Sequence, residues 1–131
     1  MLTGFEKITE DLNQYEEHEV LPLIVAGLRS KIGKDKAITG TDICTKMNAS
    51  GRLKEYKLNP VKLRKIISAI RIHNFLPMVC SNSRGYYVAD TAQELDECLQ
   101  SLRERLSQQQ RVVDALEQQG KINQLRKAFH G

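Results

Sequence analysis

The sequence predicts a mainly α-helical fold with one small β-hairpin and a long C-terminal helix. Asn59-Pro60 is a sharp helix start, because asparagine caps helices and proline fits the first helical position. Two short apolar segments flank a polar turn at residues 81–85, which indicates a hairpin. After Thr91, leucines recur at spacings of four and three, which is typical of a long amphipathic helix.

The composition is that of an ordinary globular chain. Its 131 residues are 40% hydrophobic and 27% charged, which suffices for one domain with its own core. No apolar run reaches about 18 residues and no secretory signal is visible, so we expect a cytoplasmic protein that does not contact a membrane. The three cysteines and three histidines are scattered, and we therefore expect no disulfide, metal or other cofactor.

Charge is distributed unevenly along the chain. Residues 1–20 carry a net charge of −5, residues 21–90 of +9 and residues 91–131 of 0. We predict an acidic N-terminal helical arm over residues 1–19, a basic domain over 20–90, and a long helix over the remainder. A local positive excess attracts polyanions, although a solvated basic face without a partner is also common.

Two helices are expected in the first part of the chain. One should cover residues 3–14 and begin with the capping box Thr3 and Glu6. The other is strongly apolar and should begin at Pro22 and end at Gly33, since proline suits a first helical turn and glycine a helix end.

The segment up to Asn59 should be less regular. Residues 37–39 are a candidate short strand. Thr41 is the expected N-cap of a short helix over residues 42–47. Residues 48–58 are expected to form a loop.

The helix predicted over residues 59–73 is amphipathic at about 100° per residue. Its buried face should consist of Leu63, Ile66, Ile67 and Ile70. Its exposed face should consist of Val61, Arg64, Lys65, Ser68 and Ile72. Arg71 lies near the buried side, where we expect a structural salt bridge.

Residues 75–80 and 86–89 are the two expected strands of the hairpin. Successive side chains of a strand point to opposite faces, so only one of Tyr86 and Tyr87 should pack on the core. The pattern leaves open which of the two it is.

The long helix should begin with the capping box Thr91 and Glu94 and run to residue 119. Gly120 is expected to interrupt it before a short last helix. The predicted dimerisation seam consists of Leu95, Leu99, Leu102, Leu106, Val113 and Leu116, with Gln109 as a polar member that sets register. We expect a homodimer; the alternative is packing on the helix of residues 3–14 within one chain.

Helix, helix, helix and hairpin follow one another in the order of a winged helix-turn-helix. Residues 59–67 (NPVKLRKII), Ile70-Arg71 and residues 83–89 (SRGYYVA) resemble small winged-helix proteins of phages and prophages. In those proteins a helix with this pattern precedes such a hairpin, and a long helix follows. The resemblance covers roughly residues 20–106 and implies DNA binding in a bacterial or phage-infected cell.

The residues offer a physical route to DNA binding. An α-helix fits the major groove, where Arg and Lys reach guanine acceptors, and Arg also suits the narrow minor groove. The expected DNA-binding residues are Asn59, Val61, Lys62, Arg64, Lys65, Ser68, Asn82, Ser83 and Arg84. The expected contacts to the DNA backbone are Lys34, Lys36, Arg52, Lys54 and Lys57.

Three hypotheses remain at this point. The first is a homodimeric protein that binds double-stranded DNA and acts in transcription or replication control. The second is a protein–protein interaction module with little DNA affinity. In the third, residues 1–19 cover the basic face as an internal mimic of DNA charge. We expect no enzyme and no catalytic residue, because no Ser-His-Asp order, GKS or GKT phosphate loop or HExxH motif is present.

Overall fold

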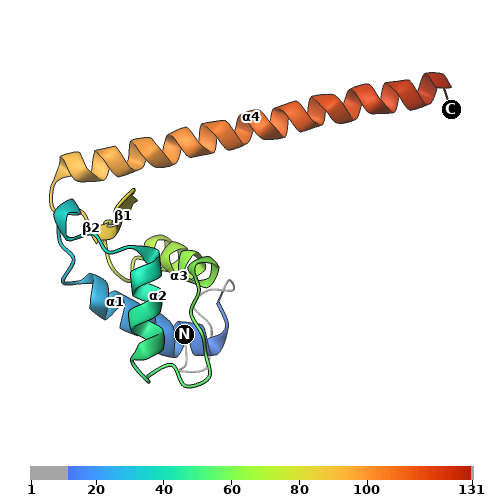
Figure 1. Ribbon diagram of the computed structural model, residues 1–131. Coiled ribbons are helices and arrows are strands. Elements are labelled where there is room, and N and C mark those ends of the chain that lie inside the picture. The colour runs from blue at the N-terminus through green and yellow to red at the C-terminus, as the bar shows by residue number, and fades with distance from the viewer. Residues whose placement is uncertain (1–11, 131) are drawn as a thin grey trace, which may run out of the picture. The chain divides into compact units, whose positions relative to one another are not determined.

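The computed structural model describes residues 12–130 and divides into two units (Figure 1). The compact unit, of which residues 12–95 are described, contains three helices and a hairpin. Its elements are α1 (Leu21–Leu28), α2 (Gly40–Ala49), α3 (Pro60–Ile72), β1 (Val79–Asn82) and β2 (Gly85–Val88). The helical unit, residues 96–130, is the remainder of α4 (Ala92–His130). The predicted class, mainly helical with a small antiparallel hairpin and a long C-terminal helix, is confirmed.

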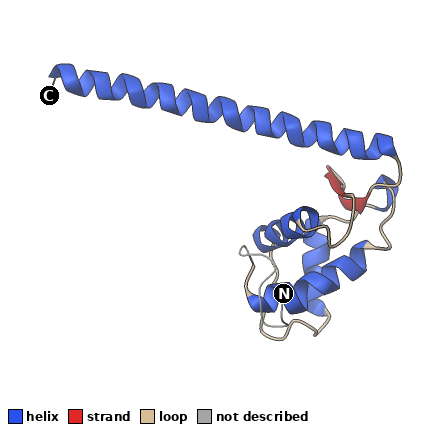
Figure 2. Ribbon diagram, turned by 180° about the vertical axis from the view of Figure 1, so that it is seen from behind, coloured by secondary structure: helices blue, strands red, loops and turns tan. Residues whose placement is uncertain are grey.

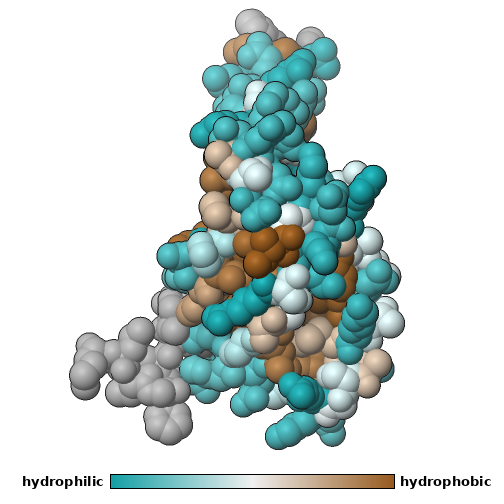
Figure 3. Space-filling model, turned by 90° about the vertical axis from the view of Figure 1, so that its left-hand side faces the viewer, coloured by the Kyte–Doolittle hydropathy of each residue, from teal (hydrophilic) through white to brown (hydrophobic). Residues whose placement is uncertain are grey.

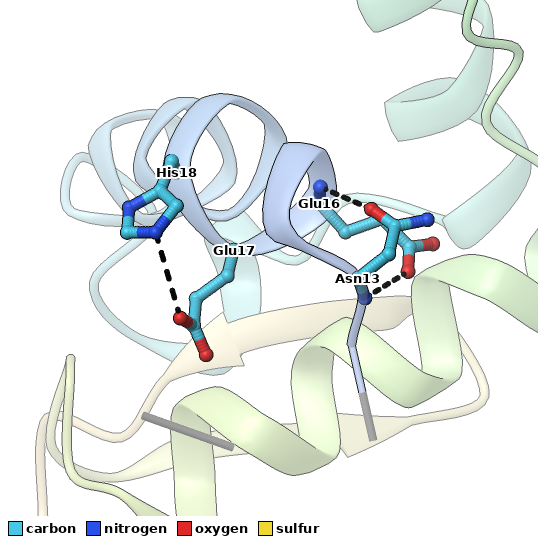
Figure 4. A network of polar contacts seen from close by, with 4 residues as sticks. All are labelled: Asn13, Glu16, Glu17 and His18. Carbon is cyan, nitrogen blue, oxygen red and sulfur yellow. Dashed lines mark hydrogen bonds and ion pairs between the residues drawn. The ribbon is translucent and has the colours of Figure 1, made fainter. Parts of the chain in front are cut away.

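The helix that contains Pro22 starts earlier than predicted. It begins after Asn13, whose side chain accepts from the Glu16 N–H at 2.7 Å while Glu16 accepts from the Asn13 N–H at 3.1 Å (Figure 4). These reciprocal bonds form a capping box. A π-helical turn η1 (Glu16–Val20) continues directly into α1, and Pro22 lies inside this continuous helix.

The predicted start at Pro22 is therefore wrong. Proline lacks an N–H and its ring crowds the carbonyl four residues earlier, and the wider π turn just before Pro22 offers room for it. The helix also ends at Leu28, because Ile32 pairs with Val88 in a β-bridge instead of completing another turn. The predicted helix over residues 3–14 and its capping box lie almost wholly outside the described residues.

α2 is capped by Thr39, whose hydroxyl accepts from the Asp42 N–H at 3.1 Å. The prediction that Thr41 is the cap is wrong, since Thr41 lies within the first turn. Residues 37–39 do not form a strand; instead Ile38 makes one antiparallel bridge with Tyr86 through two hydrogen bonds of 2.9 and 2.8 Å.

α3 agrees with the prediction. The Asn59 side chain accepts from the Lys62 N–H at 2.8 Å, and Pro60 is the first helical residue. Leu63, Ile66, Ile67 and Ile70 are buried in one hydrophobic core. α3 contacts α1, α2 and β1, and Figure 2 shows the helices grouped beside the hairpin.

The first strand begins at Val79, four residues later than predicted. Asn74 and Met78 have positive φ angles of 55° and 60°, which extended strands do not allow. Tyr87 is the fully buried tyrosine, whereas Tyr86, on the opposite face of β2, is half-buried but packs against the helical core. The prediction that only one of them packs inward is therefore wrong.

α4 is one uninterrupted helix of 39 residues, about 58 Å long at about 1.5 Å per residue. The predicted break at Gly120 is wrong, because one glycine costs only about 1 kcal/mol in a helix. The Thr91 hydroxyl caps the helix by accepting from the Glu94 N–H at 3.1 Å. Glu94 in turn accepts from the N–H groups of Asp90 and Lys34 at 2.8 and 3.0 Å, which fastens the start of α4 within the compact unit.

On the face shown in Figure 3, hydrophilic residues predominate, but hydrophobic residues gather at the centre of the compact unit. The large hydrophobic side chains exposed on this unit are Ile32, Val61, Ile72 and Met78. No helix among the described residues has both the length and the apolar character needed to cross a membrane.

Candidate nucleic-acid interface

The outer face of α3 is basic and exposed. Val61, Arg64, Lys65, Ser68 and Ile72 are exposed, as predicted from the helical wheel. α3 contains no acidic residue, and in the described part of the chain no ion pair within 4.0 Å involves Arg64 or Lys65. Both cationic side chains are therefore available to an external anion.

Lys62 is held within the protein. Its ammonium lies 4.7 Å from the centre of the Tyr56 ring and donates to the Lys57 carbonyl at 3.1 Å. The side chain is half-buried, so Lys62 supports the loop before α3 more directly than it faces solvent. Among the predicted DNA-binding residues, Lys62 thus makes contacts inside the protein, whereas its neighbours Arg64 and Lys65 are exposed.

The loop before α3 is fixed by side chains that sequence reasoning did not single out. The Asn48 amide donates to the Leu58 carbonyl and accepts from the Leu58 N–H, both at 2.9 Å. The Tyr15 hydroxyl donates to the Leu53 carbonyl at 2.7 Å, and the Tyr15 and Tyr56 rings pack with centres 5.6 Å apart. These contacts position the N-terminal end of α3.

Tyr56 also reaches the buried Glu16. Its hydroxyl donates to the Glu16 carboxylate at 2.6 Å. Burial acts to raise the pKa of Glu16, but the hydrogen bonds from Tyr56 and Asn13 and the positive charges of Lys65 and Lys62 outweigh it, so the pKa lies below its ordinary value. Burial, followed by the Glu16 contact, raises the pKa of the Tyr56 hydroxyl. Glu16 thus remains a buried carboxylate beneath the basic end of α3.

Arg71 connects α3 to the hairpin. Its guanidinium donates to the Val79 carbonyl at 2.8 Å and to the Ser81 hydroxyl at 3.3 Å. The structural role was predicted, but the expected salt bridge is wrong, because both partners are neutral. Arg71 lies two helical turns beyond Arg64 and within about 20° of it on the wheel, so β1 borders the exposed face.

The hairpin ends in an exposed turn of Ser83 and Arg84. The Asn82 side chain accepts from the Arg84 N–H at 2.8 Å and shapes the turn. Gly85 has a φ of +126°, and a Cβ there would lie 2.1 Å from the Ile38 carbonyl oxygen. Glycine therefore lets β2 approach Ile38 closely enough to form the bridge at Tyr86.

The predicted backbone contacts lie in two places. Arg52, Lys54 and Lys57 are exposed on the loop that leads into the N-terminal end of α3. Lys34 and Lys36 are exposed in a short 3-10 helix, η2 (Lys34–Lys36), which contacts β2. Both groups precede α3 in the sequence; the first leads directly into α3 and the second contacts the hairpin.

The predicted dimerisation seam on α4 is partly open. Leu95, Leu99 and Leu102 are half-buried, whereas Leu106, Val113 and Leu116 are exposed. Val112, which the seam did not include, is exposed as well.

The described residues contain no group of His, Cys, Asp or Glu side chains arranged to hold a metal ion. No protein-family model, curated protein or solved structure matches the chain.

Proposed function

We propose that this chain binds double-stranded DNA through a winged helix-turn-helix. α3 would enter the major groove, and the Ser83–Arg84 turn would contact the backbone or the minor groove. The observation that supports this best is the continuity of the exposed Arg64 and Lys65 face of α3 with the hairpin, through the Arg71 contacts to β1. α3 and the hairpin both belong to the compact unit.

Individual residues would have different roles. Arg64 and Lys65 would donate to base edges or phosphates, and Val61 would contact a thymine methyl group. Arg84 would contact the DNA backbone or the minor groove from the hairpin turn. The Asn59 oxygen already caps α3, so only its amide nitrogen would be offered to a DNA acceptor. A role in transcription or replication control, with α4 joining two copies, completes the proposal.

The test is binding to a pool of random-sequence duplexes, measured by fluorescence anisotropy at several salt concentrations. We expect log affinity to fall with log salt with a slope of several units, because bound Lys and Arg release counterions. Arg64→Ala and Arg84→Ala should each weaken binding roughly 5- to 100-fold. Arg111→Ala, which removes the same charge from an exposed position of α4, is the matched control.

The open stretch of α4 favours a second candidate, a protein–protein interaction module. Leu106, Val113 and Leu116 are exposed along one seam of α4, and contiguous exposed apolar groups mark interaction sites. If the folded, unsubstituted chain does not bind DNA even at low salt, the DNA proposal is rejected and this candidate is favoured.

A further inference from the structure

Four exposed apolar side chains of α4 lie on or beside the predicted seam, in a short stretch with a well-defined centre. Two further exposed ones, Ile122 and Leu125, lie off the seam, beyond Gly120. Leu106, Val112, Val113 and Leu116 are 66%, 58%, 46% and 61% exposed, respectively. The stretch runs from residue 106 to 116, so its midpoint is Arg111. The seam ends at Leu116, because its next two positions are Gly120 and Asn123.

Opposite charges stand at the two ends of this stretch. In a heptad repeat with Leu106 and Val113 at position a, Arg103 and Glu117 both occupy position e, and Val112 occupies position g. Arg103 precedes the apolar stretch and Glu117 follows it. Both are exposed and neither forms an ion pair among the described residues.

A parallel pair of α4 helices would leave these charges unmatched. In that arrangement position g faces position e of the next heptad, which sets Arg105 against Gln110 and Val112 against Glu117. No opposite charges meet over the apolar stretch, and an apolar side chain is placed beside a carboxylate.

An antiparallel pair centred at Arg111 matches both the charges and the apolar groups. Position e then faces position e and position g faces position g, so Arg103 of each copy meets Glu117 of the other. Val112 meets Val112 at the centre, and Leu106 faces Leu116. We propose that α4 binds α4 of a second copy of this chain in this antiparallel register.

The orientation determines where the two compact units are attached. Leu95 precedes Arg111 by 16 residues, so the two copies of Leu95 would lie about 48 Å apart along the helices. A parallel pair would bring them to within about 10 Å. If the proposed DNA binding holds, the dimer would favour two separated half-sites over adjacent ones.

Two neighbouring cysteine substitutions distinguish the orientations without DNA. Val112→Cys should cross-link under mild oxidation, because Val112 meets its own copy at the centre of the antiparallel pair. Val113→Cys is the matched control. In the antiparallel pair this cysteine would face Gln109 of the other copy, whereas in a parallel pair it would face the same cysteine of the other copy. Cys44, Cys80 and Cys98 are buried, and the unsubstituted chain measures their background.

We expect several-fold more covalent dimer from Val112→Cys than from Val113→Cys, on reducing-agent-free gels. The reverse order would overturn the antiparallel register. The proposal would also be overturned if both variants gave no more covalent dimer than the unsubstituted chain, because α4 would then not pair at its centre. This holds whether sedimentation shows a monomer or a dimer.

A charge exchange gives a second readout in solution. Arg103→Glu should weaken self-association roughly three- to tenfold, by placing like charges opposite one another, and adding Glu117→Arg should restore it. Arg111→Glu makes the same charge change at position f, away from the pairing face, and should have little effect. Failure of the double variant to recover would contradict the pairing of Arg103 with Glu117. All these measurements are made without DNA, so their failure would not bear on DNA binding.

Discussion

The Tyr56 hydroxyl donates a 2.6 Å hydrogen bond to the Glu16 carboxylate, 40 positions earlier in the chain. This contact joins the first described helix to the loop that leads into α3. Because Glu16 also caps its own helix at Asn13, one buried carboxylate organises two elements.

Removing the Tyr56 hydroxyl should destabilise the compact unit. Tyr56→Phe leaves the Glu16 carboxylate without its strongest side-chain donor, so we expect a loss of about 1–3 kcal/mol in the free energy of unfolding, measured with urea. Tyr15→Phe is the comparison, because its hydroxyl donates only to a neutral carbonyl and should cost about 0.5–1.5 kcal/mol. Equal losses would contradict a special role for the Glu16 contact.

Glu16 should make stability depend on pH in the acidic range. Its pKa is lower in the folded chain than the ordinary 4.5, so the folded state favours the ionised form. The corresponding stability is complete well above pH 4.5 and is lost as the pH falls through the folded pKa. Glu16→Gln should flatten this part of the stability curve, and an unchanged acid slope would show that Glu16 is not its source.

Lys62 and Lys65 should respond differently to replacement. Lys62→Ala removes the contacts with Tyr56 and the Lys57 carbonyl, so it should lower stability by roughly 0.5–2 kcal/mol. Lys65→Ala should leave stability within about 0.5 kcal/mol, because its side chain is exposed on the outer face of α3. Under the proposed function it should also weaken DNA binding. Unfolding measurements on both variants, paired with anisotropy, check this; a larger loss of stability for Lys65→Ala than for Lys62→Ala would contradict the internal role of Lys62.

The Arg71 contacts should hold the hairpin against α3. Arg71→Met keeps much of the aliphatic bulk but loses the bonds to Val79 and Ser81, at a cost of about 1–2 kcal/mol. Amide hydrogen exchange should rise at Ile38 and Tyr86, whose mutual hydrogen bonds close the hairpin onto the core. Unchanged exchange at both amides would show that the hairpin is held in place without Arg71.

Two glycines should respond in opposite directions to alanine. Gly85→Ala places a Cβ 2.1 Å from the Ile38 carbonyl oxygen at a φ of +126°, so we expect a loss of about 2–4 kcal/mol. Gly120→Ala lies in open space within α4 and should raise helix stability by up to about 1 kcal/mol. Thermal unfolding followed by circular dichroism would measure both changes.

Features that depend on neighbouring residues could be predicted from the sequence. Asn59 and Pro60 start α3 because the cap and the fixed proline φ act within one turn, and the apolar spacing identifies its buried face. Thr91 caps α4 for the same reason. The outer face of α3, with Arg64 and Lys65, follows from the same helical period.

Errors arose where two local signals compete. Thr39 and Thr41 are both good caps, and Thr39 is used because Ile38 just before it is held by Tyr86 on β2. Proline suits both a helix start and a position after a π turn, so Pro22 alone does not reveal that Asn13 begins the helix. Gly120 weakens a helix without ending it.

The position of α3, the start of α4, the hairpin turn and the basic face thus follow from short-range chemistry that the chain carries in its order of residues. The Glu16–Tyr56 bond, the Arg71 link to β1 and the internal role of Lys62 do not, because each joins a side chain to groups that only folding brings within hydrogen-bonding or ring-contact distance. Whether a basic residue faces solvent or its own protein is decided by such contacts, since the side chain is long enough for either.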